Sequence, residues 1–453
     1  MKGDFSRDSF DKAKHFSRVL MQQGRVQLDA DWNEQVAILL HYMRTLAADL
    51  IGPFGGPEGD QYGFKITGNK TTDDFSIGKG RYYVDGILCE NEQEITYKNQ
   101  KNFPNQPPDL MIPELNTEEA PYLVYLDVWE RHVTPIEDDD IREKALNGAD
   151  TATRAQIVWQ VKVLNSMKYN KSEDVHNDWA TVVETIEKRA PNKHGCLEAQ
   201  IKEQEETEDP CTTSPASKYR GPENQLYRIE IHQGSSDKND KPQTPTFKWS
   251  RDNGSIASLV EKVSDTEFTV QKPRGFDAGQ WVEFSTDETE LHGLPGSLAK
   301  LYKVDGNTLI LDPTTKVLFA ATKVRRWDHK TPEGDIKIEK RPNVGKPVPG
   351  ETDWINLEYG LKVKFKQGIY RTGDYWLIPA RVATGDIEWP PQPPHGIRHH
   401  YAPLAILTVE TGKLKVDTES DGDCRCSFPP QTQTSDCNSL DSYGDLRCDT
   451  NAE

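Results

Sequence analysis

The residues from 31 to 51 carry the pattern that most restricts how this chain can fold. Apolar side chains recur there at helical spacing and form one broad stripe, made of Val36, Leu39, Leu40, Met43, Leu46, Leu50 and Ile51. Asp29 or Asp31 can cap this helix, and Glu34 lies in its first turn, where the helix dipole favours an acid. An apolar stripe of this size is unfavourable in water, so the helix needs a partner surface.

Beyond this helix the sequence pattern is mostly that of strands. Short apolar runs joined by Gly-containing turns predict a mainly β, multi-domain fold of small barrels or sandwiches, with an N-terminal arm and the amphipathic helix. The pair Asp85 and Gly86 predicts a tight hairpin, and the nearly continuous apolar start of residues 122–133 predicts a strand buried on both faces.

The same pattern suggests where the chain divides. We expect an arm and helix at 1–52, a small β unit at 53–98, a β domain at 121–246 with a polar insertion at 165–223, a small barrel at 247–312, a C-terminal β section at 313–417 and a flexible acidic tail with cysteines at 418–453. A single helix at 179–188 is expected inside the insertion.

Charge and hydropathy argue against several classes of protein. The chain has 73 acidic and 55 basic residues, and its net charge of -18 has the wrong sign for a nucleic-acid-binding surface. No apolar run is long enough to span a membrane. The polar N-terminus does not look like a secretory signal, and the odd number of seven cysteines indicates reduced thiols in a cytoplasmic protein.

Three histidines are the best candidate for a chemical site. His395, His399 and His400 lie within six residues of one another, and neutral imidazole is a common ligand of zinc or iron. The alternative, which we favour, is a structural role, because no fixed cysteine or carboxylate partner is evident. A helix cap explains the acidic run at 137–140 more simply than calcium does. The spacing of four late cysteines also favours free thiols over a zinc site: Cys424, Cys426, Cys437 and Cys448.

No common catalytic motif occurs in the chain, so we expect neither an enzyme nor a cofactor. This leaves a glycosidase open, since its paired carboxylates have no fixed spacing. Residues 249–254 and 375–376 combine aromatic and polar side chains that could stack on a sugar. A tryptophan on a strand is more often part of a core.

The segment ahead of the helix contains apolar residues that no nearby strand pattern can receive. We therefore expect residues 2–23 to be an extended arm that contacts another subunit rather than its own body. The predicted docking residues come from this arm and from the helix: Phe5, Phe10, Phe16, Val19, Leu20, Trp32, Leu39 and Met43.

Residues 19–34, VLMQQGRVQLDADWNE, placed between an arm and an amphipathic helix, resemble the N-terminal attachment segments of baseplate and tail-fibre proteins in contractile phage tails. The chain to about residue 430 is also similar to a bacterial family of uncharacterised proteins associated with phage-tail-like contractile injection systems. This similarity rests on residues 2–10, 122–132, 150–154, 219–232, 247–254, 370–381 and 395–404.

The resemblance implies a structural subunit of such a particle, associated with the baseplate or forming a fibre, spike or cage, and docked to other baseplate or tail subunits. We expect it to be assembled in the cytoplasm within a particle that can later leave the cell. Because the apolar stripe suits a shared interface, we also expect a homotrimer or a higher cyclic assembly. The alternatives are a particle-borne protein that binds or cleaves a surface glycan, and a free cytoplasmic enzyme that uses a metal at His395.

Overall fold

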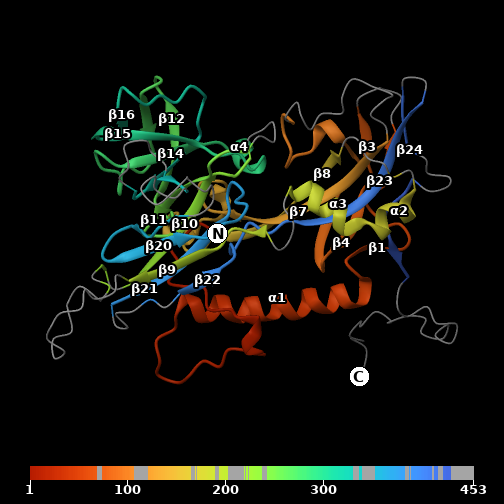
Figure 1. Cartoon of the computed structure of the whole chain (residues 1–453), viewed down its shortest axis with the longest axis horizontal. Coiled ribbons are helices and arrows are strands. Elements are labelled where there is room, and N and C mark those ends of the chain that lie inside the picture. Colours follow the sequence, from red (N-terminus) through yellow and green to blue (C-terminus); the bar gives the residue numbers. More distant parts are fainter. Residues whose placement is uncertain are drawn as a thin grey trace, which may run out of the picture.

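The long helix α1 (Asp29–Ile51) lies along one side of a molecule that is otherwise built mostly from strands (Figure 1). This computed structural model describes residues 1–68, 74–106, 121–164, 169, 171–188, 193–201, 219, 221–222, 224–236, 242–329, 336–338, 352–382, 387, 389–410, 413–416 and 422–429. Several small sheets and one closed barrel account for the strands, which confirms the mainly β, multi-domain fold class with an N-terminal helix.

The N-terminal lobe contains three sheets around one core. One sheet has the order β25 (Ser427–Phe428), β1 (Phe54–Pro57), β4 (Gly80–Val84) and β5 (Ile87–Asn91). A smaller sheet has the order β2 (Ile66–Gly68), β3 (Phe75–Ile77) and β6 (Ile95–Thr96). The third has the order β24 (Lys413–Val416), β23 (His400–Glu410), β7 (Tyr122–Val133) and β8 (Arg154–Leu164).

Strand β7 is buried on both faces over its first eight residues, as its apolar sequence predicts. Val124 belongs to the core shared by the three sheets. Leu123 points to the other side, where the helices α2 (Ser172–Asn177) and α3 (Trp179–Glu187) cover it. The expected helix at 179–188 is therefore present as α3, but it is not the single element of the insertion, which also contains α2 and the strand β9 (Leu197–Ile201). The hairpin between β4 and β5 also turns where predicted, with φ values of 47° at Asp85 and 75° at Gly86.

The central lobe consists of two four-stranded sheets that share a second core. The first has the order β18 (Ile336–Lys337), β11 (Thr246–Ser250), β10 (Asn224–Gln233) and β21 (Tyr375–Arg381). The second has the order β19 (Ile355–Asn356), β20 (Leu361–Phe365), β9 (Leu197–Ile201) and β22 (Trp389–Gln392). The strands β9 to β11 precede the barrel in the sequence and β18 to β22 follow it, yet they meet in one lobe.

The third unit is a closed barrel, drawn in green at the upper left of Figure 1. Its strands run in the order β12 (Ala257–Lys262), β13 (Glu267–Val270), β16 (Thr308–Leu311), β15 (Ser297–Asp305), β14 (Trp281–Ser285) and β17 (Lys323–Trp327). Phe268 and Phe284 stack in its core with ring centroids 4.3 Å apart. The short helix α4 (Asp287–Leu291) connects β14 to β15 and starts with a capping box at Thr286.

Short 3-10 helices occupy four of the connections: η1 (Lys12–Lys14), η2 (Tyr97–Asn99), η3 (Asp139–Ile141) and η4 (Lys144–Leu146). The acidic run at 137–140 therefore leads into η3, where the Asp138 side chain accepts a hydrogen bond from the backbone N–H of Asp140. None of the helices in the described ranges combines the length and apolar character needed to cross a membrane.

The spatial units do not follow the order of the chain, which corrects several predicted domain bounds. The β unit at 53–98 is not a separate domain, because its sheets share a core with β7, β8 and β23. The predicted domains at 121–246 and 313–417 each divide among different units. The barrel is present, but its strands span residues 257–327 rather than 247–312, because β11 pairs with β10 in the central lobe and β17 closes the barrel. The tail prediction from 418 onward is wrong for residues 422–429, where β25 pairs in parallel with β1.

Candidate functional site

Helix α1 exposes most of its large apolar side chains, so the predicted stripe lacks a cover within the described residues. Only Ala30 and Ile38 of this helix are buried. The exposed side chains have exposed fractions between 38% and 74% and are Trp32, Val36, Leu39, Leu40, Tyr42, Met43, Leu46 and Leu50. Leu39 and Met43, two of the predicted docking residues, therefore remain exposed beside the β unit at 53–98.

Contacts on the opposite side of α1 hold it against the N-terminal lobe. The Arg44 guanidinium donates two hydrogen bonds, of 3.1 Å and 2.9 Å, to the Glu130 carboxylate on β7. Gly86 lies against the carbonyl oxygen of Arg44, where an added Cβ would come within 2.1 Å. Gly86 therefore has two roles. Its positive φ favours glycine in the hairpin, and its lack of a side chain lets α1 pack closely against the hairpin.

The start of α1 differs from the predicted cap. Leu28 occupies the cap position and makes no side-chain cap hydrogen bond. Asp29 instead accepts a hydrogen bond of 2.8 Å from the backbone N–H of Ser6. Burial alone would raise the pKa of Asp29, but the hydrogen bonds from Ser6 lower it below its usual value. The carboxylate therefore ties the arm to the helix rather than capping it.

The first ten residues pack onto their own chain. The Lys2 ammonium lies 3.1 Å from the Glu230 carboxylate of β10. Phe5 makes an edge contact with the ring of His132, and Phe10 packs near a histidine ring of α1. The prediction that residues 2–23 contact another subunit rather than their own body is therefore wrong for this first part, and Phe5 and Phe10 contact their own chain instead.

The second part of the arm does leave apolar side chains in water. Phe16 and Leu20 are exposed, as predicted, and Val19 is half-buried with its backbone N–H donating to the Gln35 side chain of α1. The same segment exposes further apolar residues that the predicted docking set did not include: Met21, Val26 and Leu28. We name residues 16–28 together with the exposed face of α1 the apolar face.

Two hollows border the apolar face. One, of about 1010 Å³, lies between α1 and the N-terminal lobe and is lined by Leu40 and Met43 on one side and by Leu88 and Trp159 on the other. The other, of about 630 Å³, lies where the arm, α1 and the barrel meet. Its lining combines the exposed indole of Trp32 with polar and charged side chains that include Asn33, Arg142, Asp150 and Lys272.

A buried ionic network joins the arm, the central lobe and the barrel. The Lys248 ammonium on β11 lies 2.5 Å from the Glu283 carboxylate of the barrel and 3.3 Å from that of Glu230. Trp327 donates its indole N–H to Glu283 over 2.9 Å. Burial alone would raise the pKa of Glu283, but the charges of Lys248 and Lys2 outweigh burial and lower it to about 2.

Sequence reasoning missed this network. The alternation in β10 places Arg228, Glu230 and His232 on one face, a pattern typical of a strand with one solvent-exposed face. In the structure this face is buried against the barrel and the arm. Lys248 gives no signal of burial either, because it alternates with Phe247 and Trp249 as in a strand with one exposed face, yet all three are buried.

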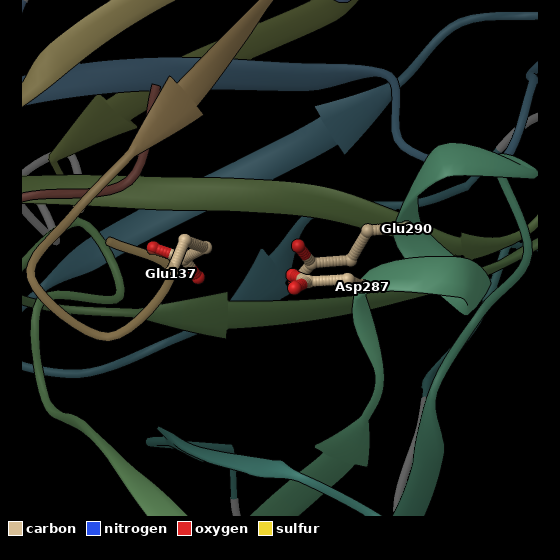
Figure 2. A group of neighbouring side chains, drawn as sticks. All are labelled: Glu137, Asp287 and Glu290. Atoms are coloured by element: carbon tan, nitrogen blue, oxygen red, sulfur yellow. The ribbon is translucent and has the colours of Figure 1, made fainter. Parts of the chain in front are cut away.

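Three carboxylates come together beside the barrel (Figure 2). Glu137 follows β7, whereas Asp287 and Glu290 lie on α4, and one oxygen of each falls within 4.8 Å of the others. The Lys323 ammonium lies among them, at 3.1 Å from Glu137, 2.8 Å from Asp287 and 2.7 Å from Glu290. Arg131 also pairs with both carboxylates of α4. A lysine therefore supplies the positive charge that a metal ion would bring.

The three candidate histidines bind different partners and do not form a ligand set. His399 pairs with the Asp127 carboxylate on β7 over 2.6 Å, and His400 pairs with Asp85 over 2.7 Å. The backbone N–H of Leu377 donates to Nδ1 of His395, and burial lowers the pKa of His395 to about 4. Within the described ranges, the group at Glu137 is the only three-residue arrangement of potential ligands, so the metal hypothesis for His395, His399 and His400 is not supported.

Asp127 is a second buried carboxylate that is paired with basic side chains. Its carboxylate accepts from His399 and, over 2.6 Å, from the Lys162 ammonium on β8. Burial alone would raise the pKa of Asp127, but the charges and hydrogen bonds of His399 and Lys162 lower it well below its usual value. The ring of His399 also lies 4.9 Å from that of Trp129. His399 thus joins β23 to β7 across the lobe.

The aromatic segments considered for sugar stacking lie in the core instead. Trp249 and Trp376 are buried in the central lobe. Tyr375 is covered by the Arg228 guanidinium, which lies 3.8 Å from its ring centroid. The core role that the sequence favours for tryptophans on strands is therefore confirmed for Trp249 and Trp376.

The late cysteines separate into two groups. Cys424 is buried beside α2 and α3, and Cys426 is half-buried next to β25; both are free thiols. Burial raises the pKa of Cys424, so its thiol stays protonated at neutral pH. Cys437 and Cys448, the other members of the four-cysteine alternative, lie outside the described residues.

Comparison with protein families gives one match. The sequence pattern of a family of unknown function (DUF6519) matches residues 1–181, 166–271 and 313–434. These ranges include the arm, α1, strands of both lobes, and the barrel strands β12, β13 and β17. No curated protein and no solved structure matches the chain.

Proposed function

The chain belongs to the DUF6519 family of unknown function, and from this premise we propose that it is a non-enzymatic structural subunit of a phage-tail-like contractile injection apparatus, located at or near the baseplate. The apolar face, residues 16–28 with the exposed side of α1, is the observation that carries this proposal. In the assembled particle, other baseplate or tail subunits cover that face.

The size of the apolar face supports a role in an assembly. Its exposed side chains add up to more than the roughly 300–600 Å² of the largest apolar patch on a typical soluble monomer. Covering apolar surface is worth roughly 25 cal/mol per Å², so this face supplies a strong driving force for association. The contacts at Arg44 and Gly86 hold α1 in place, so the face is a firm surface.

The location of the face agrees with the sequence resemblance. Residues 19–34, which resemble the attachment segments of baseplate and tail-fibre proteins, contain exposed apolar residues from both the arm and α1, among them Leu20, Val26 and Trp32. A segment that only stabilised its own chain would bury these side chains. Their exposure is the pattern expected of a segment that binds a neighbour.

The test is incorporation into particles. The full chain is produced together with the contractile apparatus in a host that carries both, and sedimented particles are assayed for this protein beside sheath and tube proteins. The variant Met21→Asp with Val26→Asp should enter particles about tenfold less, because burying an unpaired carboxylate costs far more than the 1.4 kcal/mol that changes affinity tenfold.

Gln22→Asp is the matched control, since Gln22 is an exposed polar residue of the same segment. It should enter particles at the normal level. Absence of the wild-type protein from sedimented particles, or equal incorporation of the Met21 and Val26 variant, contradicts the proposal.

A second candidate function is recognition of a surface glycan by the same particle-borne protein. The cleft of about 630 Å³ favours it, because an exposed indole beside Asn33, Arg142 and Asp150 can combine stacking with hydrogen bonds to hydroxyl groups. Retention on a glycan array that is lost in Arg142→Ala with Asp150→Ala supports this role. No retention of the wild-type chain on the array argues against it.

A further inference from the structure

Six exposed side chains of α1 fall on the two apolar positions of a heptad repeat. Their spacing alternates between four and three residues along the helix, in the order Trp32, Val36, Leu39, Met43, Leu46 and Leu50. Val36, Met43 and Leu50 occupy position a, and the other three occupy position d. This is the repeat by which helices pack side by side in coiled coils. We name these six residues the seam.

The seam faces away from its own chain. The two buried residues of α1, Ala30 and Ile38, and Arg44, which pairs with Glu130, lie outside the seam on the other half of the helical wheel. A helix that stabilises only its own fold directs its large apolar residues inward. In α1 the inward side carries mostly small or polar residues, and the large apolar residues form the outer side.

We propose that the seam packs against the seams of further copies of this chain, in a parallel bundle of three or more α1 helices. This inference deepens the proposed function and rests on it, because it assigns a partner to part of the apolar face. Residues 16–28 remain available for other subunits.

Charge supports a second copy as the occupant. The chain has a net charge of -18, so copies repel one another wherever acidic surfaces meet. The seam contains no charged residue, and the positions beside it hold Asn33, Leu40, Gln35, Tyr42 and Ala47, with Asp49 near the end of the helix. Copies can therefore meet here without placing like charges in the contact.

The width of the apolar surface favours more than two helices. Leu40 and Tyr42 flank the seam and are also exposed. A pair of helices buries mainly positions a and d, whereas additional helices also cover the flanking positions. Copies related by one rotation axis along the helices run in the same direction, which makes the bundle parallel.

The exposed area is sufficient for a stable contact. The six seam residues together with Leu40 and Tyr42 expose roughly 100 Å² each, or about 800 Å² per copy, which is the contribution of one partner to a standard-size interface.

The mass of the purified full chain, measured by sedimentation velocity at about 10 µM, tests the inference. We expect the wild type to have at least three times the mass of one chain. Leu39→Asp and Met43→Asp should each give a monomer with an unchanged circular dichroism spectrum, because both side chains are exposed within one chain. Thr45→Asp is the matched control, an exposed position of α1 off the seam, and should keep the wild-type mass.

Cysteine cross-linking tests the parallel arrangement. Position 43 meets itself in a parallel bundle, so Met43→Cys should give a disulfide-linked dimer under mild oxidation. The wild type and Thr45→Cys should not. A monomeric wild type, or a Leu39→Asp variant with the wild-type mass, overturns the inference, and a dissociating Leu39→Asp without a Met43→Cys cross-link overturns the parallel bundle.

This experiment uses no particle, so its failure is separable from failure of the proposed function. A monomeric chain that still enters sedimented particles leaves the docking role intact and refutes only the bundle. An oligomer that never enters particles supports the bundle and contradicts the injection apparatus.

Discussion

Lys323→Met removes the ammonium group that lies among the carboxylates of Glu137, Asp287 and Glu290, the three side chains drawn in Figure 2. Methionine keeps an unbranched side chain of similar length, so the change removes charge with little loss of volume. Three carboxylates then remain together, and Arg131 still pairs with two of them, Asp287 and Glu290. We expect the attachment of the barrel to the loop after β7 to weaken.

The size of the effect follows from burial. Removing one partner from a buried ion pair costs about 3–5 kcal/mol. Glu137 is 5% exposed, but Asp287 and Glu290 are 53% and 31% exposed, so water screens part of their repulsion. We therefore expect Lys323→Met to lower the free energy of unfolding by about 2–3 kcal/mol at pH 7.

The dependence on pH identifies the cause. Burial alone would raise the pKa values of Asp287 and Glu290, but Lys323 lowers both below their usual values. Their contribution to stability is therefore present at neutral pH and is lost as the pH falls through the folded-state pKa values. In Lys323→Met, protonation of these carboxylates relieves their mutual repulsion and stabilises the folded variant. The difference in free energy of unfolding between variant and wild type should therefore narrow from pH 7 to about pH 4.

Urea unfolding of the full chain, followed by tryptophan fluorescence at several pH values, measures this effect. Lys303→Met is the matched control, since Lys303 forms an exposed pair with Asp305 on the same barrel and should change stability little. A deficit of Lys323→Met that stays constant between pH 7 and pH 4, or no deficit at pH 7, refutes the reasoning.

Gly86→Ala should lower the free energy of unfolding by about 1–3 kcal/mol and increase proteolysis of α1, because its Cβ would meet the Arg44 carbonyl; Gly24→Ala, at a similar φ in open space, is the control. Lys2→Met should cost about 1–2 kcal/mol in urea unfolding, since Glu230 loses one of its cations, whereas a free arm predicts no change. Asp127→Asn should lower stability by about 2–4 kcal/mol at pH 7, because it leaves Lys162 and His399 without their carboxylate. Because the pKa of Asp127 is lowered in the folded chain, the difference from the wild type should shrink as thermal unfolding is repeated at lower pH, and a difference that grows on acidification contradicts this account.

Local patterns in the sequence determined the secondary structure and much of the class of fold. The helical repeat from Val36 to Leu50, the Asp85 and Gly86 turn and the apolar run of β7 all appear where the residues predict them. Each depends on backbone preferences and on neighbours a few residues away, which a linear sequence displays directly. The presence of a barrel was predictable for the same reason, although its closing strand was not.

Only the tertiary structure decided which surfaces face one another. Lys323 and Glu137 are 186 residues apart, and His399 and Asp127 are 272 apart, so no local spacing reveals either pair. The polar face of β10 has the alternation of a solvent-exposed strand, yet it is buried because the barrel and the arm bring opposite charges to it. The apolar stripe of α1 was predictable from the sequence. That the stripe faces away from the chain depends on which side of the helix packs against the rest of the molecule, and only the tertiary structure decides this.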